Sequence, residues 1–283
     1  MRSVLVTGGS GKLGKFVVRH LMESGWNVTS IDRVPHPDSR VWSTIVDLLD
    51  SGSVMDLMTG ANERHSKLDA VVHLAAIPAP GLQSDKATIN NNLNSTLNVF
   101  MAARNAGIKK VVFASSETVL GLPFDTPPPY VPVDEEYEPR PESFYSLSKV
   151  LEERLAKELC RWDHELSMVG LRFSNVIDPI EYPSFEDFQD DAIKRKWNLW
   201  GYIDARDGAL AVEKALDYET PGFEPFIIAS PDSVMRMTNT QLLQEVFPEV
   251  ALRRQVSEHE TLLGIEKAKR LLGFNPSNSW RDL

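Results

Sequence analysis

The chain has a single cysteine, lacks long apolar runs and carries no excess of basic residues. Among its 283 residues only Cys160 is a cysteine, so no disulfide can form within the chain. Cys160 falls on an apolar-periodic helix, where a buried core thiol is expected. No apolar stretch approaches the ~18 residues that a bilayer requires, and Val4–Val6 is too short for a signal-peptide core. We therefore expect a cytoplasmic protein with no membrane partner.

The charge balance is acidic. The chain has 30 Lys and Arg against 40 Asp and Glu, which gives a formal net charge of −10 at pH 7. Nucleic-acid binding requires clustered basic residues, so we expect no nucleic-acid partner. We also expect no metal centre. The length and the 42% hydrophobic content suit one large α/β domain, or a domain with a small lobe.

A glycine-rich turn follows the first apolar run. Residues 7–14 read TGGSGKLG, and apolar residues then recur at helical spacing over 16–22. Gly8 suits a tight turn, Gly11 lets the backbone approach a pyrophosphate, and Gly14 lets the helix pack closely on the strand. The helix N-terminus also favours phosphate charge. This strand, turn and helix predict dinucleotide binding.

The second predicted strand, residues 26–31, ends in an acidic residue. Asp32 can accept hydrogen bonds from both ribose hydroxyls of an adenosine. A carboxylate repels a 2′-phosphate, so Asp32 favours NAD over NADP. Arg33 directly follows and can hold such a phosphate, which keeps NADP open.

Strands and helices alternate through the first two-thirds of the chain, which predicts a doubly wound parallel sheet of the α/β class. Ligands bind such sheets outside the carboxyl ends of the strands. We divide the chain into a dinucleotide-binding domain at 1–172 and a small substrate lobe at 173–283, interleaved with the last strands. Strands are expected at 41–46, 68–76, 111–116, 169–173 and 226–230, and helices at 86–106, 145–160, 240–247 and 266–272.

Tyr145 and Lys149 are four residues apart on a predicted helix, so their side chains share one face. A phenol titrates near pH ~10, and a neighbouring ammonium lowers its pKa toward the working range. Such a pair can perform acid–base chemistry on an alcohol. An ordinary pair on a solvated helix face gives the same spacing.

Taken in order, the motifs resemble the extended short-chain dehydrogenase/reductase family, the group of sugar-nucleotide epimerases and dehydratases with a Rossmann fold. The resemblance covers nearly the whole chain. The motifs that carry it are Thr7-Gly8-x-x-Gly11-x-x-Gly14, Asp47-Leu48, His73-Leu74-Ala75-Ala76, Asn92-x-x-Ser95-Thr96, residues 115–121, Tyr145 with Lys149, residues 171–176 and residues 202–207.

The resemblance implies a role for each of these residues. Tyr145 would exchange a proton with a substrate hydroxyl, Lys149 would lower its pKa and bind the nicotinamide ribose, and Ser116 would hold the reacting oxygen. Ser116 can instead cap backbone, and Asn92 can instead serve a helix kink or the surface. The implied cofactor-binding residues are Gly8, Ser10, Gly11, Lys12, Leu13, Gly14, Asp32, Arg33, Asp47, Leu48, Leu74, Ala75, Ala76, Asn92, Ala114, Tyr145, Lys149 and Arg172.

The segment 175–200 is short for a lobe that holds a nucleotide. This trimmed layout resembles the uronate dehydrogenases, which oxidise free sugar acids and in which an Arg near Arg195 holds the substrate carboxylate. A solvated basic run at 194–196 explains the same residues. Glu117 stands where those enzymes tend to carry Asn. The implied substrate-binding residues are Ser115, Ser116, Glu117, Asn175 and Arg195.

The expected function is NAD-dependent hydride transfer at a hydroxyl of a small sugar or sugar acid. A nucleotide-sugar epimerase or dehydratase with tightly bound NAD is the alternative, and a non-catalytic NAD(H)-binding regulator is the third hypothesis. Helices 86–106 and 145–162 form a dimer seam in similar proteins, so we expect a homodimer. An apolar stripe with Leu93, Leu97 and Met101 fits that seam or packing on the sheet. The proline-rich stretch 123–141 predicts a long ordered loop over the site.

Overall fold

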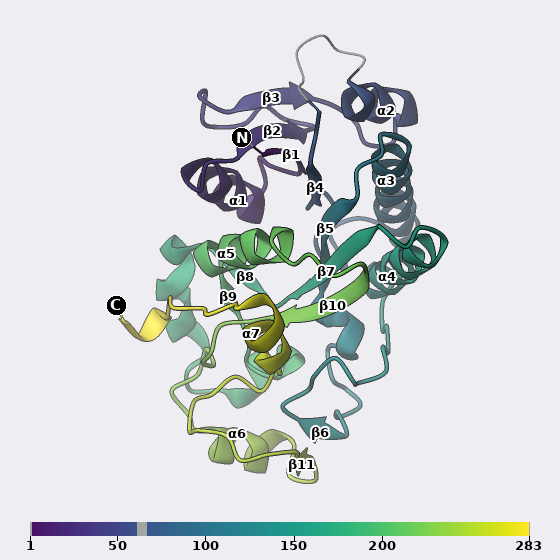
Figure 1. Cartoon of the computed structure of the whole chain (residues 1–283). Coiled ribbons are helices and arrows are strands. Elements are labelled where there is room, and N and C mark those ends of the chain that lie inside the picture. The colour runs from purple at the N-terminus through teal and green to yellow at the C-terminus, as the bar shows by residue number, and fades with distance from the viewer. Residues whose placement is uncertain (1, 61–66, 283) are drawn as a thin grey trace.

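The computed structural model describes residues 2–60 and 67–282 and arranges them around a seven-stranded sheet (Figure 1). The strand order is β10-β7-β5-β4-β1-β2-β3, and every neighbouring pair is parallel. The predicted doubly wound α/β fold is therefore confirmed. The sheet strands are β1 (Ser3–Thr7), β2 (Asn27–Asp32), β3 (Trp42–Ile45), β4 (Ala70–His73), β5 (Lys110–Ser116), β7 (Ser167–Phe173) and β10 (Gly222–Ile228).

Successive side chains of a strand point to opposite faces of the sheet, so each face has its own hydrophobic core. In β1, Val4 and Val6 belong to one buried cluster and Leu5 to the other. Helices α1 (Lys12–Glu23), α5 (Ala205–Leu216) and α7 (Glu266–Leu272) cover the first face. The opposite face is covered by α2 (Ser51–Thr59), α3 (Asp85–Asn105) and α4 (Phe144–Trp162), with Cys160 buried there as expected.

A third buried cluster forms a smaller lobe beyond the carboxyl ends of β5, β7 and β10 (Figure 1). It draws on three segments that are far apart in sequence, represented by Phe124, Trp200 and Leu262. Its regular elements are the 3₁₀ helices η1 (Glu117–Leu120), η2 (Pro179–Phe188), η3 (Ala192–Asn198) and η4 (Trp280–Asp282), helix α6 (Asn239–Val246), and short strands β6 (Tyr130–Val131), β8 (Val176–Ile177), β9 (Ile203–Asp204) and β11 (Ala251–Leu252).

Two expected segments differ from the structure in a way that shapes the site. The strand expected at 68–76 ends at His73, because the backbone N–H groups of Leu74 and Ala75 turn toward the Thr7 hydroxyl. The proline-rich stretch pairs β6 with β11 and buries Val131 in the lobe core. It therefore lies beside the site: Pro123 at its start and Glu142, directly after its end, line the cleft described below.

The described ranges contain no helix long and apolar enough to cross a membrane.

Candidate active site

A cleft of about 780 Å³ runs along the carboxyl ends of β1, β2, β4, β5 and β7. The order in which successive strands join the sheet reverses direction between β1 and β4. Doubly wound sheets bind their ligands at such a point. The cleft brings together most of the residues expected from the sequence. Those that line it are Gly8, Gly11, Lys12, Leu13, Gly14, Asp32, Arg33, Leu48, Leu74, Ala75, Ala76, Ala114, Ser115, Ser116, Glu117, Tyr145, Lys149 and Asn175.

The glycine turn leaves room for a ligand's phosphates. Gly8 has φ +72°, and a Cβ there would lie 2.7 Å from the backbone nitrogen of Ala75. A Cβ on Gly14 would lie 2.0 Å from the carbonyl oxygen of Gly8. Helix α1 begins after Gly11 with no side-chain cap, so its first N–H groups remain available to an anion. The turn thus fits the pyrophosphate of a dinucleotide.

The acid at the end of β2 is held at the edge of this turn. Asp32 Oδ2 accepts a hydrogen bond from the backbone nitrogen of Ser10 at 3.0 Å. The Arg33 guanidinium turns away to Asp47, 3.0 Å from Oδ1, and to Asn91, 3.1 Å from Oδ1. The carboxylate therefore stands at the adenosine end of the cleft with its neighbouring cation already paired.

Helix α4 brings the phenol and the ammonium to the other end of the cleft. Ser143 starts the helix with a reciprocal cap to Ser146, at 3.1 Å and 2.9 Å, which places Tyr145 in the first turn. Lys149 follows one turn later, with Nζ 5.9 Å from the centre of the Tyr145 ring. Ser116 ends β5, and its hydroxyl lies near enough to the Tyr145 side chain to favour the phenolate. Three polar groups thus converge on one point.

Burial changes the expected acidity of the phenol. It raises the pKa of Tyr145 above its ordinary value, although the positive charge of Lys149 and the nearby Ser116 hydroxyl both lower it. The effect of Lys149 has the predicted sign, but the prediction of a net lowered pKa is wrong for the protein without its ligands. The charge of Lys149 therefore does not outweigh the burial of the phenol.

The Ser116 hydroxyl also caps the backbone at the start of η1, which is the alternative role that the sequence leaves open for it. Its Oγ accepts from the Thr118 backbone nitrogen at 3.1 Å and from the Thr118 hydroxyl at 3.0 Å. Ser115 also lines the cleft, but its hydroxyl is engaged with Glu153, to which it donates at 2.6 Å from Oε1. Between the two serines, it is the Ser116 hydroxyl that lies near Tyr145.

Glu117 places a buried carboxyl group at the substrate end of the cleft. Its side chain is 3% exposed and accepts hydrogen bonds from Ser174 Oγ at 2.6 Å and Asn198 Nδ2 at 3.2 Å. Burial raises the pKa of this carboxyl to about 7, against the opposing effect of those hydrogen bonds and of Arg195. The group therefore changes charge near neutral pH.

Arg195 does not reach the cleft, which corrects the expectation that it holds a substrate carboxylate. Its guanidinium lies over the rings of Phe188 and Trp197, at 5.2 Å and 4.9 Å, and donates to the Gly201 carbonyl at 3.0 Å. Burial lowers its pKa, and the charge of Glu117 opposes that shift. Glu117 therefore stands on the cleft side of the cation.

Two residues expected to contact the cofactor have their side chains engaged elsewhere. Asn92 is buried and exchanges hydrogen bonds of 2.8 Å and 3.1 Å with the Ile77 backbone, so it fixes the chain after β4. Arg172 is buried in an ion pair with Glu153, 2.8 Å from Oε2. The structure does not bring either side chain to the cleft.

The side chains of Ser10 and Asp47 also lie outside the cleft lining. The Ser10 hydroxyl donates to the Val34 carbonyl at 3.1 Å, and Asp47 pairs with Arg33. Other lining residues were not expected from the sequence. Ser174 follows β7 directly, so the strand-end rule would have found it. Trp197 reaches the cleft from η3 and has no local signal.

Comparison with known proteins gives a family and several relatives. The model of the NAD dependent epimerase/dehydratase family matches residues 4–196. The chain is 28% identical over 194 residues to UDP-glucose 4-epimerase 2 of Oryza sativa subsp. japonica, which covers 62% of this chain and 45% of that protein. It is 30% identical over 198 residues to the NAD-dependent glucose-6-phosphate dehydrogenase of Haloferax volcanii, covering 63% of this chain and 71% of that protein.

A solved structure, MoeE5 in complex with UDP-glucose and NAD, matches with a TM-score of 0.72 and 25% identity, over 99% of this chain and 95% of that one. The chain spans about half the length of the curated epimerases that it matches. The family model covers well over half of the chain, from β1 into η3. The chain therefore belongs to the NAD-dependent epimerase/dehydratase family.

Proposed function

We propose that this chain is an NAD-dependent oxidoreductase that transfers a hydride between nicotinamide and a hydroxyl group of a small sugar or polyol. One observation carries the proposal: Ser116, Tyr145 and Lys149 line the same cleft as the glycine turn and Asp32. A dinucleotide held by that turn would extend toward the phenol. Such a constellation in one cleft supports catalysis rather than a purely regulatory role.

Bound NAD supplies the hydride acceptor, and the chain's own residues handle the proton. Ser116 holds the oxygen of the substrate hydroxyl. Tyr145, as the phenolate, takes the proton from that hydroxyl as the carbonyl forms. Lys149 stabilises the phenolate by its charge and fixes its position within the cleft. The reverse reaction returns the proton from the phenol to the carbonyl oxygen.

The substrate end favours a neutral hydroxyl compound over a sugar acid. Glu117 lines this end, while the Arg195 guanidinium lies behind Glu117 and outside the cleft lining. An ionised Glu117 repels a substrate carboxylate, and its hydrogen bonds to Ser174 and Asn198 leave it rigid. A sugar hydroxyl, in contrast, can donate a hydrogen bond to this carboxylate.

The alternative function is epimerisation of a nucleotide sugar on tightly bound NAD. It is favoured by the match to MoeE5 with UDP-glucose, which extends over 95% of that chain. The small-sugar function is favoured by the Haloferax relative, whose name gives a dehydrogenase of a sugar phosphate without a nucleotide. Glu117 and the short segment 175–200 add weight to a small neutral substrate.

The test is a panel of free sugars, polyols, sugar acids, sugar phosphates and nucleotide sugars, each with NAD and with NADP. We expect net NADH formation with a neutral sugar or polyol and the lowest activity with uronates. Epimerisation of a UDP-sugar without release of NADH, together with NAD that co-purifies with the protein, would establish the alternative. Failure to bind NAD at all would overturn both.

A further inference from the structure

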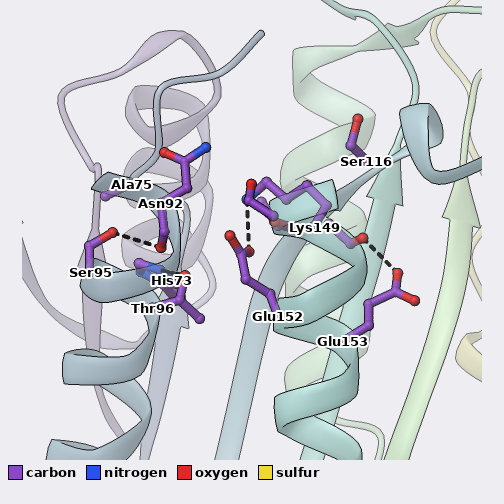
Figure 2. A network of polar contacts seen from close by, with 12 residues as sticks. His73, Ala75, Asn92, Ser95, Thr96, Ser116, Lys149, Glu152 and Glu153 are labelled. Atoms are coloured by element: carbon purple, nitrogen blue, oxygen red, sulfur yellow. Dashed lines mark hydrogen bonds and ion pairs between the residues drawn. The ribbon is translucent and has the colours of Figure 1, made fainter. Parts of the chain in front are cut away.

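A second buried carboxyl group lies beneath the catalytic pair. Glu152 is on α4 and its side chain is fully buried. Its Oε2 accepts a hydrogen bond from Lys149 Nζ at 2.9 Å, and the same Nζ donates to the Ala114 carbonyl at 2.9 Å. Figure 2 shows Glu152 below Lys149, on the side of α4 that faces α3. The ammonium is thus anchored on the side away from the cleft.

The surroundings of Glu152 contain one ionic partner. Burial raises the pKa of Glu152. Glu153, which is turned to Ser115 and Arg172 on the same helix, raises it slightly further. From α3, the Thr96 hydroxyl lies beside the carboxyl group and favours its ionised form. The other oxygen, Oε1, has no hydrogen-bond partner of good geometry among the described residues. Lys149 is therefore the group that most favours the ionised form of this carboxyl group, against the effect of burial.

Strand β4 contributes no second cation to the group. His73 is held between the Thr7 hydroxyl at 2.7 Å and the Thr96 hydroxyl at 3.0 Å. Burial and the charge of Lys149 lower the pKa of His73 to about 3, so its ring is neutral. A buried carboxylate with one cation and an unsatisfied oxygen contributes little to the stability of the fold. Because Glu152 contacts Lys149 directly, we look for its effect on Lys149.

The charge of Lys149 acts in two directions. Toward the cleft it favours the ionised form of Tyr145, and toward the core it faces Glu152. A carboxylate 2.9 Å from an ammonium cancels much of that ammonium's field at a distance. Burial opposes the charged form of Lys149, but Glu152 and Tyr145 raise its pKa overall, so it keeps its proton. Glu152 also acts directly on Tyr145, disfavouring the phenolate.

We propose that Glu152 is a positioning residue that anchors Lys149 and limits how far its charge assists the ionisation of Tyr145. The inference deepens the proposed function, because it concerns the residue to which that function assigns the proton. It predicts that removal of the Glu152 charge makes Tyr145 a stronger acid and widens the pH range in which the phenolate is available.

The test follows Tyr145 without substrate or cofactor. The ultraviolet absorbance of tyrosinate is titrated in the wild type and in Tyr145→Phe, and the difference isolates Tyr145. The same titration is then repeated with the single variant Glu152→Gln and with the double variant that carries Glu152→Gln and Tyr145→Phe. We expect the Tyr145 midpoint to fall by about one pH unit. An unchanged midpoint overturns the proposal, including the case in which Glu152→Gln only lowers thermal stability.

Three further variants make the result specific. Glu152→Met removes the charge without leaving a polar atom in the core and must lower the midpoint similarly. Glu152→Asp keeps the charge and must retain the midpoint near that of the wild type. Glu158→Gln, farther along α4 and paired with Arg154 and Arg161, is the matched control and must leave the midpoint unchanged. If Gln and Met both fail to fold while Asp folds, the role is structural and the proposal fails.

An activity arm separates this inference from the proposed function. With a substrate from the panel, the acidic limb of the pH–rate profile for alcohol oxidation should move to lower pH in Glu152→Gln by the same amount as the titration. If no substrate is found but the Tyr145 midpoint falls, the proposed function fails and the electrostatic inference stands. If substrates are found but neither the Tyr145 midpoint nor the pH–rate profile moves, the proposed function stands and the electrostatic inference fails.

Discussion

At the residue scale, the phenol of Tyr145 is the group on which the proposed chemistry depends. It lines the cleft together with Ser116 and Lys149. Tyr145→Phe removes the acid–base group and leaves the glycine turn intact, so kcat should fall by ~10²–10⁴-fold while the Kd for NAD stays nearly unchanged. Steady-state kinetics and a fluorescence titration with NAD measure the two quantities. Lys149→Ala should impair both, and unaltered turnover of Tyr145→Phe would remove Tyr145 from its role.

The buried Glu117 gives stability a pH dependence. Because burial raises its pKa from 4.5 to about 7, the stability it contributes is fully present below pH 4.5 and is lost as pH rises through 7. Glu117→Gln lacks this titration. Across that window the free energy of unfolding should shift in favour of the variant by up to about 3 kcal/mol.

Urea unfolding of both proteins at several pH values measures the shift, with the exposed Glu245→Gln on α6 as the matched control. A difference between wild type and Glu117→Gln that stays constant with pH would show that Glu117 does not titrate in this window. The same variant bears on specificity, because loss of the negative charge should improve kcat/KM for sugar acids relative to neutral sugars.

Asp32 and Arg33 set the choice between the two dinucleotides. Asp32→Asn keeps an acceptor for the ribose but removes the charge that repels a 2′-phosphate. The ratio of kcat/KM for NADP to that for NAD should rise by about 10-fold, equivalent to about 1.4 kcal/mol. Arg33 is paired with Asp47 and Asn91 in this structure, and a 2′-phosphate would have to draw its guanidinium from them. If Arg33 supplies the gain in this way, the double variant with Arg33→Ala should lose it. An unchanged ratio in Asp32→Asn would show that the discrimination arises elsewhere.

The positions of the site residues were predictable where a local pattern places the side chain. The glycine turn, Asp32, Ser116, Tyr145 and Lys149 each follow from a strand end or a helical spacing, and all line the cleft. Burial and long-range partners were not predictable. The sequence places Arg195 in a basic run and gives no sign that its side chain stacks on two aromatic rings behind Glu117.

At the element scale, α3 and α4 present an exposed apolar face. Leu97, Met101 and Leu151 are 39%, 37% and 37% exposed, although the two helices pack against each other and the sheet. These side chains do not pack on the sheet, and we propose that they form the seam of a homodimer. Leu97→Glu should convert the dimer to a monomer in analytical ultracentrifugation. Leu271→Glu, which alters a similarly exposed leucine on α7, is the control and should leave the assembly unchanged.

If the wild-type protein sediments as a monomer, the dimer proposal is wrong and the apolar face needs another explanation. If Leu271→Glu dissociates the assembly while Leu97→Glu does not, the interface lies on the opposite face of the sheet.

The predicted boundaries of helices and strands agree with the structure where the spacing of hydrophobic residues alone determines them. The helix expected at 266–272 coincides with α7, and the strands expected at 111–116 and 169–173 lie within β5 and β7. The strand after Leu68 was predicted too long because its end is set by the Thr7 hydroxyl, which comes from another strand. Such a contact between distant residues leaves no local pattern.

At the scale of the whole molecule, the parallel sheet and the presence of a small lobe were predictable. The sequence assigns the lobe to 173–283 and does not reveal that its core also uses earlier residues such as Phe124. Alternation of strand and helix is a local property that determines the fold class. The lobe is assembled from the segments after β5, β7 and β10, and its core joins residues as distant as Phe124 and Leu262. The lobe shapes the substrate end of the cleft. The proposed class of substrate could therefore be limited to neutral sugars and polyols only once the structure gave the positions of Glu117 and Arg195.

The measurement that tests the account most directly is a crystal structure of the chain with NAD. The account predicts pyrophosphate on the first turn of α1, the adenosine ribose on Asp32, and the nicotinamide ribose within hydrogen-bonding distance of Lys149 Nζ, with its ring beside the Tyr145 hydroxyl. Lys149 should keep its bond to Glu152 in that complex. A nicotinamide placed away from Tyr145, or a cleft that NAD does not enter, would contradict the account.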